Sequence, residues 1–194
     1  MDMYRVGLRL SSEDFTGIEL PEIVPVFHRW IQRGVVEGPL VDVADYHHVH
    51  HGPGIVLVAF DANYAVNFCE GRFGLVWYRK RPSEVPLLDT LVAGARKAIR
   101  LCAELEGEPE FRERLRFGAD KISVFSNDRL LAPNTASTED KWRPILQGLA
   151  RALWGASGVQ LDRERNDPRE RFSMALRSAG NPTLKDVLAR LDGR

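Results

Sequence analysis

The sequence predicts an α+β protein in which helices cover a mostly antiparallel sheet. Some stretches alternate apolar and polar residues, with the period of two that half-buried strands show. Others repeat apolar residues every three or four positions, as a helix with one buried side does. A third observation is the pair Glu70-Gly71 between two adjacent strand-like stretches, because glycine accepts the positive φ that a tight hairpin needs.

Length and composition are those of a globular protein. The chain has 194 residues, of which 44% are apolar and 28% are charged. At about 100–200 residues per domain, we expect residues 1–194 to form a single domain. The 27 Lys and Arg residues balance 27 Asp and Glu residues, so no basic excess is available to neutralise phosphates. We therefore expect no nucleic-acid partner.

The sequence also predicts a compartment. The N-terminal segment lacks the basic region and apolar core of a signal peptide. Cys69 and Cys102 form no CxxC pair and are too few for a disulfide scaffold. The longest strongly apolar run, from Ile55 to Phe60, is far shorter than the roughly 20 residues that cross a membrane. These features predict a soluble cytoplasmic protein that has no membrane partner.

The first half of the chain reads as strands separated by two helices. A strand is predicted over residues 4–10, with Val6, Leu8 and Leu10 on one face. Proline suits the first turn of a helix and glycine its end, so the first helix is placed between Pro21 and Gly34. The elements predicted after it are a strand over 39–46, a long strand over 55–68, its hairpin partner over 72–81, and a helix from Ser83 to about Glu106.

The second half repeats this alternation on a smaller scale. Its predicted elements are a polar linker over 107–118, a strand over 121–126, a helix that ends near Trp154, strands over 159–165 and 170–177, and a final helix capped by Thr183. Residues 1–107 and 118–194 thus have a similar order of elements. We interpret them as an internal pseudo-repeat of two βαββ(α) units that share one sheet.

This order is similar to that of the gyrase-inhibitor-like and SOUL-type heme-binding families, whose small-molecule-binding domains consist of two strand–helix–strand–strand units. The resemblance is one of element order, and it transfers no site residue to this chain. It implies a ligand site between the two halves.

The most concentrated chemical feature is the segment from Tyr46 to Gly52, which holds four of the five histidines. In an extended segment His48 and His50 project to the same side. Together with Asp45 they predict a site for a divalent transition metal ion, zinc, nickel or iron. Other candidates for the third ligand are Asp42, Asp61 and His28. The alternatives to a metal site are a solvated histidine-rich turn and a contact that responds to pH.

Known catalytic signatures do not occur in the sequence, which has no GxSxG nucleophile elbow, no phosphate-binding GxxxxGK[ST] loop and no GxGxxG motif. Catalytic and cofactor-binding residues are therefore left unassigned. The leading prediction is a binding or scaffold module that forms a homo-oligomer. The alternatives are a metal-dependent enzyme that uses the His47–His51 cluster, and a sensor that binds a small molecule, heme-like or metabolite-like, between the two halves.

Overall fold

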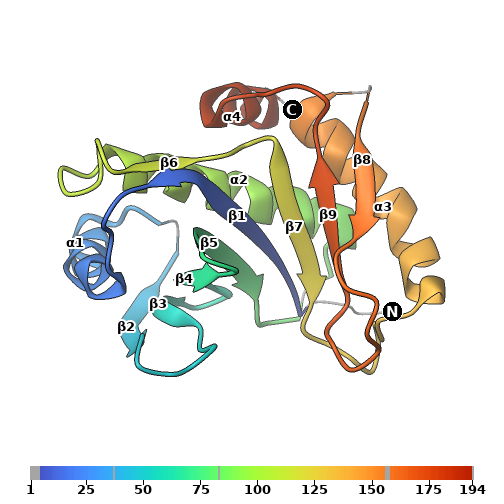
Figure 1. The fold of residues 1–194 in the computed structure, drawn as a ribbon, viewed down its shortest axis with the longest axis horizontal. Helices are drawn as coiled ribbons and strands as arrows, with labels where there is room; N and C mark the ends of the chain where they lie inside the picture. Colours follow the sequence, from blue (N-terminus) through green and yellow to red (C-terminus); the bar gives the residue numbers. More distant parts are fainter. Residues whose placement is uncertain (1–4, 37, 83, 156–157, 194) are drawn as a thin grey trace.

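The computed structural model describes residues 5–36, 38–82, 84–155 and 158–193. Within these ranges nine strands form one sheet, in the order β2-β3-β4-β5-β1-β7-β9-β8 with β6 beside β1 (Figure 1). The pairs in this sheet are antiparallel. Four α-helices and one short 3₁₀ helix in these ranges accompany the sheet, so the prediction of an α+β fold with a mostly antiparallel sheet is confirmed.

Along the chain, blocks of strands alternate with single helices. The strands are β1 (Val6–Phe15), β2 (Leu40–Tyr46), β3 (Gly54–Ala59), β4 (Ala62–Cys69), β5 (Arg72–Arg79), β6 (Leu115–Phe117), β7 (Lys121–Ser126), β8 (Gln160–Arg163) and β9 (Ser173–Arg177). The helices are the short 3₁₀ helix η1 (Leu20–Glu22), α1 (Ile23–Arg33), α2 (Leu87–Gly107), α3 (Ala136–Trp154) and α4 (Leu184–Asp192).

The main core lies between the sheet and the helices. Val6, Leu8 and Leu10 of β1 are fully buried in it, which confirms the predicted period of two. Helix α2 packs on β1 and β5, α1 packs on β2 and β3, and α4 contacts both α2 and α3. Figure 1 shows α2 crossing behind β1 and β7.

The other face of the sheet carries a smaller cluster that comes from strands alone. It consists of Val56, Ala65, Val76 and Phe125, with Ala44, Val58 and Tyr78 packed against it. Arg9 lies on this face, because it is paired with Val76 of β5 and Ser123 of β7. Strand β1 therefore presents apolar side chains to the helices and Arg9 to the other side.

Three predicted turns and caps are confirmed. Gly34 ends α1 with a φ of 63°, the left-handed conformation that favours glycine. Glu70 and Gly71 connect β4 to β5 with φ values of 53° and 73°, as a tight hairpin turn requires. The Thr183 side chain accepts a hydrogen bond from the backbone N–H of Asp186 at the start of α4.

The long strand predicted over 55–68 is wrong in one respect, because it is two strands. Strands β3 and β4 pair with each other, and the chain reverses at Phe60 and Asp61. Apolar residues continue on both sides of this turn, and Asp61 is the one turn-favouring residue in it. The period of two therefore did not reveal the break.

Two further boundaries differ from the prediction. Helix α2 begins at Leu87 with Pro86 as its N-cap, and the predicted cap Ser83 lies outside the described residues. The residue before a proline is disfavoured in the helical region, so the helix starts only after Pro86. Strand β6 lies within the predicted linker over 107–118 and pairs with the end of β1.

The two predicted halves meet where β1 pairs with β7. The first strand of each half, β1 or β7, lies at this junction. The strand after the first helix of each half, β2 or β8, lies at an outer edge of the sheet, and the strands that follow it lie between that edge and the junction. The shared sheet is therefore present. An internal repeat stays a prediction, as does the single domain over 1–194.

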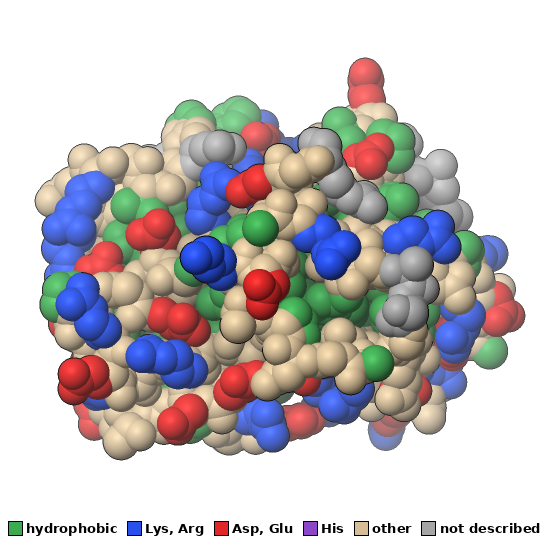
Figure 2. Space-filling view, turned by 90° about the horizontal axis from the view of Figure 1, so that it is seen from above, with side chains coloured by type: hydrophobic (Ala, Val, Ile, Leu, Met, Phe, Trp, Pro, Cys, Tyr) green, Lys and Arg blue, Asp and Glu red, His purple; other side chains and the backbone are tan. Residues whose placement is uncertain are grey.

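The surface shows charges of both signs. Figure 2 shows Lys and Arg side chains interspersed with Asp and Glu side chains on one face of the molecule. This distribution agrees with the formal net charge of zero. Among the described helices, none combines the length and the apolar character that crossing a membrane would require.

Candidate functional site

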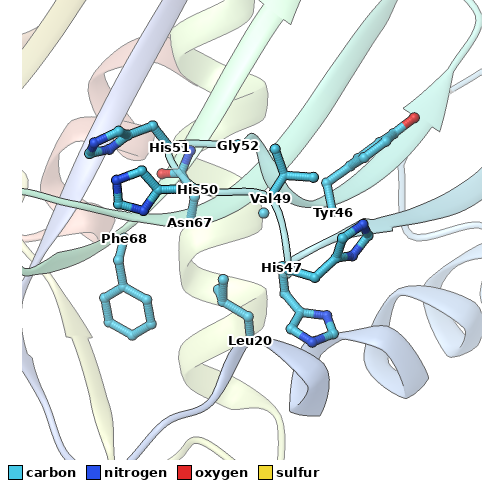
Figure 3. Close-up of a pocket in the computed structure, with 11 residues that line it drawn as sticks. Leu20, Tyr46, His47, Val49, His50, His51, Gly52, Asn67 and Phe68 are labelled. Carbon is cyan, nitrogen blue, oxygen red and sulfur yellow. The ribbon is translucent and has the colours of Figure 1, made fainter.

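A hollow of about 360 Å³ lies beside the turn that connects β2 to β3. The histidine-rich turn forms much of its wall, and η1 and the end of β4 form the rest (Figure 3). It is lined by Leu20, Tyr46, His47, His48, Val49, His50, His51, Gly52, Gly54, Asn67 and Phe68. The predicted histidine cluster therefore borders the hollow.

The turn has a defined backbone structure. The N–H of Val49 donates to the carbonyl oxygen of Tyr46 at 3.0 Å, and the N–H of Gly52 donates to that of Val49 at 2.8 Å. His51 has a φ of 56°, a conformation that is uncommon for a residue other than glycine. A Cβ atom on Gly52 would lie 2.8 Å from the carbonyl oxygen of Val49, so only glycine fits there.

Asp45 organises the start of this turn. Its Oδ1 accepts hydrogen bonds from the backbone N–H of His47 at 2.9 Å and from Nδ1 of His47 at 2.6 Å. These two hydrogen bonds lower the pKa of Asp45. Because a carboxylate only accepts, Nδ1 of His47 is the donor in the second of these bonds.

Asp45, His47 and His48 form a group in which one ligand atom of each residue lies within 4.8 Å of the others. The predicted set was Asp45, His48 and His50. The structure brings Asp45 and His48 together, but places the ring of His50 3.9 Å from that of His51. The prediction assumed an extended segment, whereas β2 ends at Tyr46 and a turn follows.

The other candidates for a third ligand are not part of this group. Within the described ranges, the group of potential metal ligands contains none of Asp42, Asp61 and His28. Asp42 uses its Oδ1 to accept from the backbone N–H of Val43, at 2.8 Å.

The far wall of the hollow contains a residue that the sequence did not indicate, Asn67. Nη1 of the buried Arg9 donates to Oδ1 of Asn67, and Nη2 donates to the carbonyl oxygen of Arg72 at 2.9 Å. A guanidinium has only donors, so the amide oxygen of Asn67 must face Arg9. Asn67 is itself one of the residues that line the hollow.

The guanidinium of Arg9 is buried, and the oxygen atoms that accept its hydrogen bonds are uncharged. Burial lowers the pKa of Arg9, yet an arginine remains protonated at neutral pH. No ion pair joins Arg9 to a carboxylate of the described residues. Gly74 gives the guanidinium room, because a Cβ atom there would lie 2.5 Å from Nη2 of Arg9. In the sequence, the feature that could have indicated a special role for Arg9 is its charge between two apolar residues of a strand, Leu8 and Leu10.

Three of the seven large hydrophobic side chains that are exposed in the described chain line the hollow, namely Tyr46, Val49 and Phe68. Phe68 also contacts the rings of Phe15 and Phe73, with centroids 5.5 and 5.6 Å away. The hollow thus combines imidazole, amide and apolar groups. The turn residues from Tyr46 to His51 that form much of its wall are exposed.

Comparisons with protein-family models, with curated proteins and with solved structures found no match to this chain. The geometry of the hollow is therefore the basis for a functional assignment.

Proposed function

We propose that the protein is a binding module that holds a divalent transition metal ion, zinc, nickel or iron, through Asp45, His47 and His48. The observation that supports this proposal is the convergence of the three side chains to within 4.8 Å at one side of the hollow. Imidazole nitrogen and carboxylate oxygen are ligands that these ions accept.

The distances suit this role after small side-chain rotations. Ligand atoms that bind a tetrahedral zinc ion at about 2.0–2.2 Å lie about 3.4 Å from each other. All three side chains are exposed and have the freedom to close from 4.8 Å or less to that separation. The hydrogen bond between Asp45 and His47 holds these two side chains side by side before an ion binds.

Calorimetric titration of Zn²⁺, Ni²⁺ and Fe²⁺ into protein without a histidine tag tests the proposal. We expect one ion per chain, and at least about tenfold weaker binding in His47→Ala/His48→Ala, because two of three ligands are lost. The matched control is His50→Ala/His51→Ala, which removes as many histidines from the same turn and should bind within about twofold of the unmodified protein.

Two single variants separate the observed group from the one that the sequence predicts. His47→Ala should weaken metal binding, and His50→Ala should not. The absence of binding by all three ions, or equal losses in His47→Ala and His50→Ala, would exclude the proposed site.

A further inference from the structure

One face of the sheet holds a buried cation that has no anionic partner among the described residues. We call this side, which carries the smaller cluster formed by strands, the strand face. Arg9 lies on it and is 9% exposed. Its hydrogen bonds go to Oδ1 and the carbonyl oxygen of Asn67 and to the carbonyl oxygen of Arg72. A guanidinium has five N–H groups, so two of them have no acceptor in this part of the chain. Because buried charges are normally paired, an anionic ligand would supply the partner of Arg9.

A second guanidinium, that of Arg171, lies on the same face. Its Cζ lies 3.8 Å from the centroid of the Phe125 ring, and its Nη1 donates to Oδ1 of Asn127 at 3.4 Å. Arg171 belongs to the segment between β8 and β9, which Figure 1 shows beside the end of β7. Burial lowers the pKa of Arg9, and the charge of Arg171 lowers it further. The two cations are therefore close enough to repel each other.

Two glycines let planar groups lie flat on the strand face. A Cβ atom on Gly74 would lie 2.6 Å from Cζ of Arg9, and one on Gly7 would lie 2.3 Å from Cζ of Phe125. Gly7 is paired with Phe125 and projects to the same side of β1 as Arg9, two residues further on. The guanidinium of Arg9 and the ring that carries Arg171 are therefore neighbours on one surface.

The carboxylates near the two guanidiniums have other partners. Oε1 of Glu164 accepts from Oγ of Ser123 at 2.6 Å. Glu70 and Glu170 both contact Arg165, at 2.8 and 3.6 Å. These acidic side chains act on the guanidiniums electrostatically, but within the described ranges none forms an ion pair with either of them. All three are exposed, so water and salt screen their charges.

We infer that Arg9 and Arg171 together bind a phosphate group on the strand face. The phosphate oxygens accept hydrogen bonds from N–H groups of the two guanidiniums, whose planar, forked geometry matches phosphate. A phosphate group carries up to two negative charges, so it balances two cations, whereas a carboxylate balances one. The inference uses residues other than the proposed metal ligands and does not depend on the metal.

The test is a calorimetric titration of the metal-free full chain at pH 8 with two probes. Inorganic phosphate represents the free ion, and phenyl phosphate represents a phosphate group on an organic molecule, so the tighter probe identifies the source. We expect one site per chain, and at least about tenfold weaker binding of acetate at equal ionic strength, because acetate has one charge. In NMR spectra of the unmodified protein, the Nε–H resonances of Arg9 and Arg171 should shift with the tighter probe, and that of Arg169 should not.

Variants complete the test. Arg171→Gln removes one of the two cations and should weaken binding of the phosphate probe at least about tenfold. Arg169→Gln is the matched control, because Arg169 lies two positions away in the same segment and is paired with Asp167 at 2.7 Å. It should bind the probe within about twofold of the unmodified protein. Arg9→Gln should show the same loss as Arg171→Gln, and Arg171→Gln decides the test if Arg9→Gln does not fold.

Three results would overturn the inference. They are the absence of binding by both phosphate probes, acetate that binds as tightly as phosphate, and equal losses in Arg171→Gln and Arg169→Gln. The proposed metal site fails or stands on different ions, different variants and a different titration, so the two results are independent.

Discussion

The carboxylate of Glu108 shows how this chain keeps a charge inside the protein. Its side chain is 8% exposed, and its oxygens accept hydrogen bonds from Nε1 of Trp30 at 2.7 Å and from Nη2 of Arg29 at 2.9 Å. Burial disfavours the ionised form, but these hydrogen bonds outweigh it and hold the pKa of Glu108 below its ordinary value. The two hydrogen bonds connect α1, which holds Arg29 and Trp30, to the end of α2.

Glu108→Gln should lower the free energy of unfolding at pH 7 by about 1.5–3 kcal/mol, because a neutral amide replaces a buried carboxylate that accepts charged and polar donors. The folded-state pKa lies below the unfolded value, so this stabilisation is present above about pH 4.3 and is lost as the pH falls through the folded pKa. Urea denaturation of both proteins at pH 7 and at pH 3 measures the difference.

Glu110→Gln is the control for this residue. Glu110 also contacts Arg29, at 2.8 Å, but its side chain is 40% exposed, so we expect a loss below about 1 kcal/mol. Equal losses for the two variants, or a Glu108→Gln effect that grows in acid, would contradict the interpretation.

Residue by residue, the sequence predicts the candidate site in part. It indicated the histidine cluster, Asp45 and His48, because their residue types are typical of metal ligands. It did not indicate that His47, and not His50, lies close to Asp45 and His48, because this depends on the turn after Tyr46. Asn67 and Arg9 are 58 positions apart, and only the pairing of β4 with β5 and of β5 with β1 brings them together.

At the scale of elements, the contact between α2 and β5 depends on Gly94. A Cβ atom at this position would lie 2.4 Å from Cζ3 of Trp77. Helix propensity alone would favour alanine there by about 1 kcal/mol. The absence of a side chain lets the helix approach the indole, and close packing is gained at the expense of helix propensity.

Gly94→Ala should therefore lower the free energy of unfolding by about 1–3 kcal/mol, because Trp77 or the helix must move to make room. Gly107→Ala is the matched control in the same helix, since no atom lies within 4 Å of its Cβ position. It should be neutral or stabilising. Thermal and urea denaturation of both variants checks this, and a stabilising Gly94→Ala would contradict the packing argument.

Elements differ in how well the sequence predicts them. The β4–β5 hairpin was predictable because Gly71 accepts the positive φ that a tight turn needs, whereas the positive φ of Glu70 is uncommon for a residue other than glycine. The turn at Phe60 and Asp61 was not, because apolar residues continue through it. Strand β6 has three residues and exists because it pairs with the end of β1, a contact that no local pattern encodes.

At the scale of the whole molecule, β1 joins the two predicted halves. It pairs with β5 of the first half on one side and with β7 of the second half on the other. Helix α2 packs on α3 and α4 as well as on β1. Nε1 of Trp154 donates to the carbonyl oxygen of Ala119 at 2.8 Å, which ties α3 to the start of the second half. Self-association of the chain stays a prediction.

This arrangement predicts that the halves do not fold separately. A fragment of residues 1–117 leaves β1 without β7 and uncovers the side of α2 that packs on α3 and α4. A fragment of residues 118–194 leaves β7 as an open edge and removes the support of α2. We expect neither fragment alone to show a cooperative thermal transition or a native near-ultraviolet circular dichroism spectrum.

An equimolar mixture of the two fragments should recover much of the near-ultraviolet signal, because the antiparallel β1–β7 pairing and the contacts of α2 need no covalent connection. The unmodified chain should unfold in one transition that is the same by fluorescence and by circular dichroism. A monomeric fragment of residues 1–117 with its own cooperative transition would show two domains. The single domain expected from the length would then be wrong.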